Sequence, residues 1–298
     1  MADGPPRTTV SAWRPPVAGI AEVFHAHFTE HAYPSHTHDT WALMILNDGA
    51  VDFACDRHRH GVTGTGTVVL LPPGVAHDGR TVTAAGFRKR VLYLDATVLP
   101  EDLTGRAVDA PVFGDALLRH RIHQLHMSLG HAGDAHAGDS PADSAQADRA
   151  QAARAQAASA QAGDVFEAES RLAFIRERLH FHLDALRPTR TPGREAHRLA
   201  AVLRDLLDSR LATGLSLHEA AAVLHAHPTH LIRCFKQTYG LPPHAYLTGK
   251  RIEWARGLLL DGRRPAEVAA TVGFHDQAHL NRHFTRHVGT TPARYAGM

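Results

Sequence analysis

Histidines in the N-terminal third have the spacing that metal sites and small-molecule sites use. His36 and His38 form a His-x-His pair. A second pattern is Gly66-x5-Pro72-x-Gly74-x2-His77. Converging neutral imidazoles bind Zn²⁺, Fe²⁺ or Ni²⁺, line an effector pocket, or act as hydrogen-bonding groups at strand ends. The His-x-His pair alone is weak evidence for a site, because such pairs arise by chance in a chain with 25 histidines. The residues alone leave a metal site, an effector pocket and a structural role open for His36, His38 and His77.

An internal repeat in the C-terminal third points to a second kind of chemistry. The first copy is His230-Leu231-x-Arg233-x-Phe235, followed by Gly240, Pro243 and Tyr246. The second copy, 49 residues later, is His279-Leu280-x-Arg282-x-Phe284, followed by Gly289, Pro292 and Tyr295. Upstream, Glu219-x-Ala221-Ala222-x-Leu224 matches Glu267-x-Ala269-Ala270-x-Val272 at an offset of 48. The offset changes by one residue, from 48 to 49, between the upstream and the downstream part of the repeat. A tight turn is expected at that point, so each copy is predicted to form a helix, a turn and a second helix.

The second helix of each copy, about Thr229–Tyr239 and Gln277–Val288, buries its Leu and Phe residues and exposes the opposite face. That face carries Thr229, Ile232, Arg233 and Lys236 in the first copy, and Gln277, Ala278, Asn281, Arg282 and Thr285 in the second. Arg bonds guanine in bidentate fashion, Asn bonds adenine, and small or apolar groups contact the thymine methyl. We therefore predict that these residues bind double-stranded DNA. Simple stacking of the repeats is the alternative, although solenoids need three or more copies.

The distribution of charge supports a polyanionic partner. From Arg190 to the end there are 15 Arg or Lys against 8 Asp or Glu, a net charge of +7. The whole chain carries +2, so residues 1–189 carry −5. A basic segment on a slightly acidic body is typical of nucleic-acid binding.

The second copy resembles the second helix-turn-helix of the AraC/XylS family of transcriptional regulators. The family pattern is Gly-Phe-x5-(Leu/Phe)-x-Arg-x-Phe, then Gly, Pro and Tyr, and here it begins at Gly273-Phe274. The resemblance covers residues 197–298 and implies two recognition helices joined by a long helix, roughly Ala245–Leu260. His225 stands where the first turn often has Gly, so we expect a positive φ there.

The pattern ending at His77 resembles the second motif of cupins, which are jelly-roll barrels. The first cupin motif is incomplete, because Trp41–Met44 occupies the stretch where its Glu would fall. Regulators of the AraC type often carry a cupin-like sensor domain that binds a small effector. The resemblance thus implies that His36, His38 and His77 line or shape an effector pocket.

Short apolar runs between turn residues predict strands in the N-terminal part. They are Trp41–Leu46, Val51–Ala54, Thr67–Leu71 and Arg90–Leu94. Turns are expected at Asn47–Gly49, Gly64–Gly66 and Pro72–Gly74. A first helix is expected at Asp115–Leu129. The predicted fold class is α+β: a cupin-like β-barrel followed by an all-α tandem helix-turn-helix domain.

Composition divides the chain into four segments. We expect a cupin-like effector-binding domain at 1–130, a low-complexity disordered linker at 131–163, a helix at 164–190 and the DNA-binding domain at 197–298. The linker contains no large apolar residue and cannot offset its ordering entropy. The helix, Val165–Leu186, has near-heptad apolar spacing, which predicts either a homodimer contact or packing on its own barrel.

The remaining features narrow the class of protein. Cys55 and Cys234 lack metal-site spacing and are expected to be buried thiols. We expect no signal peptide, no membrane span, no cofactor, no catalytic residues and a cytoplasmic location. The predicted function is DNA-binding transcriptional regulation controlled by a small effector, with a homodimer and RNA polymerase as further partners. The alternatives are a cupin metalloenzyme with a nucleic-acid-binding tail and an architectural DNA-binding protein.

Overall fold

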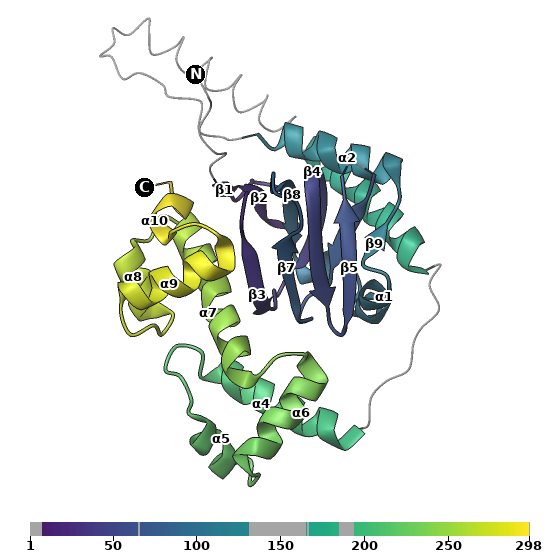
Figure 1. Ribbon diagram of the computed structural model, residues 1–298. Helices are drawn as coiled ribbons and strands as arrows, with labels where there is room; N and C mark the ends of the chain where they lie inside the picture. The colour runs from purple at the N-terminus through teal and green to yellow at the C-terminus, as the bar shows by residue number, and fades with distance from the viewer. Residues whose placement is uncertain (1–7, 65, 131–164, 166, 185–193, 298) are drawn as a thin grey trace, which may run out of the picture.

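The computed structural model describes residues 8–64, 66–130, 165, 167–184 and 194–297. The predicted linker at 131–163 and the stretch 185–193 lie outside the described residues, as does part of the predicted Gly64–Gly66 turn. The described chain forms a β-sheet part, two helices on one of its faces, and a C-terminal helical part on the other side (Figure 1).

Antiparallel strands build the N-terminal part. They are β1 Thr9–Trp13, β2 Ile20–Phe28, β3 Ala32–His36, β4 Trp41–Cys55, β5 His58–Thr63, β6 Val68–Leu71, β7 His77–Thr81, β8 Phe87–Leu94 and β9 Val112–Phe113. The first half of β4 pairs with β8 and β6, and its second half pairs with β5 and β7. Strand β4 therefore belongs to two sheet layers, one with β6 and β8 and the other with β5 and β7. This arrangement confirms the predicted cupin-like barrel.

The turn predicted at Asn47–Gly49 is wrong. Strand β4 runs through these residues, and its pairing with β8 shifts register between Leu46 and Asp48. Gly49 has φ +77°, and a Cβ there would lie 2.1 Å from the carbonyl oxygen of Gly86. Glycine here permits a bulge that bends the strand from one layer to the other, so the two predicted strands are one.

Alternating side chains of β4 face two different cores. Trp41, Leu43 and Ile45 pack in a cluster with helix α2, Ala116–Ser128, and with the helix at 167–184. Ala42 and Met44 face the barrel interior instead. Both faces of the strand are buried, which explains its continuous apolar run.

The apolar stripe of the helix at 167–184 packs on its own barrel. Leu172, Ile175, Leu179 and Leu183 are at most 7% exposed and belong to the same cluster as Trp41. The expectation that this stripe forms a homodimer contact is therefore wrong, and the alternative of packing on the barrel is confirmed. Between β8 and β9, two 3₁₀ turns, Ala96–Val98 and Glu101–Leu103, and helix α1, Thr104–Asp109, add Leu99, Leu103 and Ala107 to the same cluster.

Helices make up the C-terminal part. They are α4 Arg194–Ser209, α5 Leu217–Val223, α6 Pro228–Tyr239, α7 Pro243–Leu260, α8 Pro265–Thr271, α9 Gln277–Val288 and α10 Pro292–Tyr295. The sequence repeat corresponds to α5–α6 and α8–α9, and α7 connects the two units (Figure 1). Ser216 and Glu219 form the predicted capping box at α5. The two turns take positive φ at His225 (48°) and Gly273 (86°), as predicted.

The second unit shares a core with the barrel interior. One apolar cluster extends from Phe24, Met44 and Phe87 of the barrel to Phe284 and Tyr295 of the second unit. The first unit has a separate cluster that includes a single barrel residue, Ala76. Cys55 and Cys234 are buried and free, as expected. Among the described helices, none has the length and apolar character required to cross a bilayer.

Candidate effector chamber and nucleic-acid interface

The three predicted histidines come together at one end of the barrel. His36 ends β3 and is the register partner of His77, the first residue of β7. His38 lies two residues beyond His36, in the connection to β4. One nitrogen from each ring lies within 4.8 Å of the other two. Strand pairing therefore brings together the two sequence patterns, and all three side chains are buried.

The three imidazoles are held neutral. Burial lowers the pKa of His36 and of His38 well below the usual range, and the neighbouring histidines add to it. Burial also lowers the pKa of His77 to about 4. The Nδ1–H groups of His36 and His77 donate to the carbonyl oxygens of Pro34 (2.7 Å) and Val75 (3.0 Å). His38 Nδ1 is buried and has no hydrogen-bond partner among the described residues.

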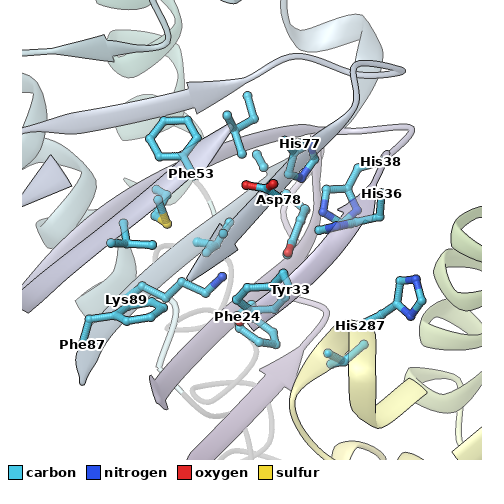
Figure 2. A pocket seen from close by; sticks show the side chains of 18 of the residues that line it. Phe24, Tyr33, His36, His38, Phe53, His77, Asp78, Phe87, Lys89 and His287 are labelled. Carbon is cyan, nitrogen blue, oxygen red and sulfur yellow. The ribbon is translucent and has the colours of Figure 1, made fainter. Parts of the chain in front are cut away.

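These histidines line a chamber of about 60 Å³ in the barrel interior (Figure 2). Most of its wall is apolar. The apolar side chains are Phe24, Ala42, Met44, Val51, Phe53, Leu71, Phe87, Val91 and Val288. About 10–15 Å³ of such space holds one water, so the chamber has room for only a few.

A lysine that the sequence analysis missed points into this chamber. Lys89 Nζ lies 4.3 Å from the centre of the Tyr33 ring and 5.4 Å from that of Phe24. Burial lowers its pKa to about 7, and the charge of Arg256 adds to this effect. Within the described residues, no carboxylate forms an ion pair with Lys89, and the Tyr33 hydroxyl is also buried without a partner. The chamber thus offers a cation and a hydroxyl to a ligand.

The C-terminal part forms the lid of the chamber. Arg256 of α7, His287 of α9 and Val288 complete its wall. Arg256 Nη2 lies 2.5 Å from Glu22 Oε1 on β2, and both side chains are buried. The guanidinium also lies 4.2 Å from the centre of the Tyr93 ring. Desolvation opposes the charge of Arg256, but Glu22, Tyr295 and Tyr93 together raise its pKa well above the usual value.

A second contact joins α7 to the loop that follows the histidine pair. Both carboxylate oxygens of Glu253 accept from the backbone N–H of Asp39, at 2.8 and 2.9 Å. Lys250 forms an ion pair with the Asp39 side chain. Burial, followed by the charge of Asp39, raises the pKa of Glu253 to about 7. Helix α7 is therefore attached to the barrel beside the chamber.

The predicted DNA-binding residues lie on the outer faces of α6 and α9. In α6, Thr229, Ile232, Arg233 and Lys236 are exposed. In α9, Gln277, Ala278, Arg282 and Thr285 are exposed and Asn281 is half-buried. The Leu and Phe residues of the repeat are buried beneath them. Each helix thus presents a basic or polar face of the kind that enters a DNA major groove.

Two family models cover most of the chain. An AraC-like ligand binding domain matches residues 19–172, which is more than half of the chain, and a helix-turn-helix domain matches residues 220–298. The chain belongs to the AraC family. It is a DNA-binding transcriptional regulator with an effector-binding domain.

Curated relatives of this AraC-family protein carry regulator names. The uncharacterized HTH-type transcriptional regulator YbfI of Bacillus subtilis is 24% identical over 258 residues, 83% of this chain and 81% of YbfI. The probable transcriptional regulator LumQ of Photobacterium leiognathi is 30% identical over 104 residues, 34% of this chain and 42% of LumQ.

Solved structures of ToxT from Vibrio cholerae have the same two-part fold. ToxT bound to an unsaturated fatty acid covers all of this chain with a TM-score of 0.53 at 13% identity, and 98% of ToxT is matched. The apo form of a ToxT variant gives a TM-score of 0.54 at 10% identity, over 98% of this chain and 96% of ToxT.

The resemblance to cupin motifs identifies the histidines, and the AraC-type repeat identifies the recognition helices, but neither predicts the lid. The signal for Lys89 is the alternation in β8, where Phe87, Lys89, Val91 and Tyr93 share one face. A lysine among three buried apolar or aromatic neighbours indicates a functional position. No comparable signal exists for Arg256 and Glu22, which are 234 residues apart in the sequence.

Proposed function

We propose that an effector bound in the chamber changes how the helix-turn-helix units are held, and thereby their binding to DNA. The observation that carries this proposal is the lid, in which Arg256, His287 and Val288 close a chamber built by the barrel. A molecule in the chamber contacts both parts of the chain at once. A ligand shifts a conformational equilibrium through its different affinities for the two states, and a shared wall supplies such a difference.

The small volume of the chamber supports a coupling between effector binding and the position of the C-terminal part on the barrel. Its volume of about 60 Å³ is small for an organic effector, since ligand pockets usually measure about 300–1,000 Å³. Barrel strands are held by their hydrogen-bonded neighbours on both sides, whereas the lid is held by side-chain contacts. We infer that the effector enters by displacing His287 and Val288, which moves the second unit.

The chemistry of the wall favours a small carboxylate with an apolar body. In the part of the chain that the structure describes, Lys89 has no carboxylate partner and the Tyr33 hydroxyl has no hydrogen-bond partner. Both face the chamber and suit the oxygens of such a group. The apolar side chains suit its hydrocarbon part. His36, His38 and His77 line the same space and contact the effector in this proposal. The fatty acid bound by ToxT, a protein of the same fold, supports this chemical class.

The DNA-reading proposal assigns one short sequence box to each unit. Arg233 in α6 and Arg282 in α9 hold equivalent positions of the repeat and are both exposed. Each bonds a guanine, and Lys236 meets a phosphate. The connecting helix α7 has 18 residues, about 27 Å at ~1.5 Å per residue. With its flanking helices, this length suits successive major grooves, roughly 34 Å apart.

The proposed function also includes a domain division, an oligomeric state and a location. We propose the domain division 1–130, 131–163, 164–190 and 197–298, and a homodimer that contacts RNA polymerase in the cytoplasm, where the DNA is. Because the heptad-like stripe is buried, a dimer must use other surfaces, and Met127 and Phe181 are apolar and more than 60% exposed. We also propose that the barrel is a sensor without catalytic residues.

The test uses the full chain and a panel of matched ligands. Short straight-chain and aromatic carboxylates, with their amides as neutral controls, are screened by thermal shift. Carboxylates that raise the melting temperature are then added to binding reactions with a DNA site obtained by selection. We expect stabilisation by carboxylates alone and a change in DNA affinity of about fivefold or more. Stabilisation by acid and amide alike contradicts the effector class, and binding without any change in DNA affinity contradicts the coupling.

A further inference from the structure

Basic side chains of two neighbouring strands meet on the outer face of the sheet, the face that α2 covers in part. In the register of β2 and β8, His25 lies opposite Arg90 and His27 lies opposite Arg88. Opposite charges stabilise such cross-strand pairs, whereas like charges destabilise them. Each pair here lacks the acidic member that would stabilise it.

These four side chains point away from the effector chamber. Successive residues of a strand face opposite sides of the sheet, and Phe24 of β2 and Val91 of β8 line the chamber. The four basic residues line a separate pocket of about 510 Å³, which we call the outer pocket. Thr9 and Ser11, the register partners of the two histidines on β1, also line it. No Asp or Glu is among the described residues that line the outer pocket.

Helix α2 extends the basic cluster beside the outer pocket. Arg90 Nη1–H donates to Nδ1 of His123 at 3.1 Å, so a neutral His123 carries its own N–H on Nε2. Arg119 Nη2–H donates to the carbonyl oxygen of Leu46 at 2.8 Å, next to Asn47 of the pocket wall. Arg119 Nε is buried and has no hydrogen-bond partner among the described residues. The cluster therefore contains more N–H donors than acceptors.

The positive charges of this cluster lack a counter-charge. Desolvation, followed by the charge of Arg119, lowers the pKa of Arg90. Desolvation and the charges of both arginines also lower the pKa of His123. Asp48 pairs with the exposed Arg88, but within the described residues no carboxylate forms an ion pair with Arg90 or Arg119. A bound anion would neutralise this excess of positive charge.

We propose that the outer pocket binds a small phosphate monoester, whose phosphate group lies between Arg88 and Arg90. The planar guanidinium group matches two oxygens of a phosphate. The two arginines are roughly 6.8 Å apart along one face of β8, so both can reach the same phosphate. The volume of the pocket lies within the range of small-molecule sites, about 300–1,000 Å³, which leaves room for the organic part of the ligand.

This site is separate from the proposed effector chamber. The chamber and the outer pocket lie on opposite faces of the same strands. Phosphate binding at Arg88 and Arg90 requires neither the carboxylate effector nor DNA. Either proposal can therefore fail while the other stands.

The first experiment measures binding by the full chain in calorimetry at constant ionic strength. The ligands are inorganic phosphate, glycerol phosphate and ribose phosphate, with glycerol and ribose as neutral controls. We expect binding of the phosphorylated compounds alone, and tighter binding of the monoesters than of inorganic phosphate. No binding of any phosphate at millimolar concentration overturns the site. Affinity no higher for the monoesters than for inorganic phosphate overturns the monoester and identifies the free ion as the ligand.

The second experiment assigns the binding to the two arginines. Arg90→Gln and Arg88→Gln are compared with Arg80→Gln, which removes an exposed arginine of β7 that pairs with Asp52. Hydrogen bonds to charged groups are strong enough that we expect at least about tenfold weaker phosphate binding in the first two variants. The control should bind as the wild type does. Because Arg88 is exposed, Arg88→Gln keeps the test decisive if Arg90→Gln does not fold. Unchanged affinity in either folded variant overturns the site.

The third experiment separates a small-molecule site from a contact with the DNA backbone. The affinity of Arg88→Gln for a selected DNA site is measured over a range of salt concentrations. Loss of one contact with a DNA phosphate lowers the salt slope by about one. We expect the salt slope of the wild type, because the outer pocket binds a small ligand. A slope lowered by about one in Arg88→Gln overturns the proposal and assigns this face to DNA.

Discussion

The two helix-turn-helix units come from one repeated sequence, yet they contact the barrel differently. In the second unit, His287 and Val288 close the effector chamber. The equivalent residues of the first unit, Thr238 and Tyr239, line a wide groove of about 950 Å³ beside the barrel. The repeated residues preserve the fold and the DNA-reading face. The barrel residues against which each unit packs therefore determine which unit contacts the chamber.

The repeated glycines show the same contrast. Gly240 and Gly289 both end a recognition helix with positive φ. A Cβ at Gly289 would lie 2.3 Å from the Phe28 ring, whereas a Cβ at Gly240 would lie 3.0 Å from Ala76. The second unit is thus inserted into the barrel mouth, and the first unit touches only its edge.

The largest expected effect comes from the buried ion pair that holds the second unit. Arg256→Met leaves Glu22 buried without its partner, which typically destabilises a protein by about 3–5 kcal/mol. The control Arg14→Met removes the exposed pair with Asp261, worth about 0–1 kcal/mol. Urea unfolding of both variants measures the difference. Equal losses in the two variants contradict a special role for the buried pair.

The paired glycines give a matched comparison of the two units. Gly240→Ala and Gly289→Ala both place a side chain at positive φ, at about 1–2 kcal/mol each. Gly289→Ala also collides with Phe28, and overpacking adds about 1–3 kcal/mol. We expect the larger fall in melting temperature for Gly289→Ala. A larger fall for Gly240→Ala means that the first unit, not the second, is the more tightly packed.

In DNA reading, by contrast, the two units are expected to be equivalent. Arg233→Ala and Arg282→Ala each cost about 1–3 kcal/mol if each guanidinium bonds a guanine, and each relaxes specificity in one box only. Binding-site selection with the two variants measures this. The two-box account is wrong if both variants lose preference at the same positions, or if neither does.

The smallest effect concerns pH and the chamber of the second unit. The pKa of Lys89 is lowered to about 7, so its ammonium is present below that pH and lost above it. Affinity for a carboxylate should therefore be constant between about pH 5.5 and 6.5, where the ligand is ionised and Lys89 is charged, and fall by up to about tenfold per unit above about pH 7. Lys89→Met should bind weakly at every pH. A wild-type affinity that does not vary between about pH 6 and 9 contradicts a role for Lys89.

Much of this arrangement was predictable from local sequence. Helix α9 begins and ends where the repeat predicts, and α6 begins one residue earlier than predicted. The helix bounds depend on periodicity and on turn residues, which are properties of nearby sequence. The cluster of His36, His38 and His77 was implied by the resemblance to cupins, and in the structure strand pairing places His36 opposite His77.

The missed features depend on contacts between distant segments. Asn47–Gly49 has the composition of a turn, but pairing on both sides of β4 turns it into a bulge. The stripe at 167–184 has the spacing of a dimer helix, but the barrel face covers it. The local sequence does not distinguish a bulge from a turn, or a buried helix from a dimer helix. Each outcome depends on which distant segment packs against these residues.

The central claim is that the second unit, and not the first, is tied to the chamber. Hydrogen exchange of the full chain carrying Glu22→Gln tests it most directly, because that change removes the carboxylate that holds Arg256. We predict faster exchange in α9 and α10 and unchanged exchange in α6. Equal acceleration in α6 and α9, or no change in α9, would contradict the account.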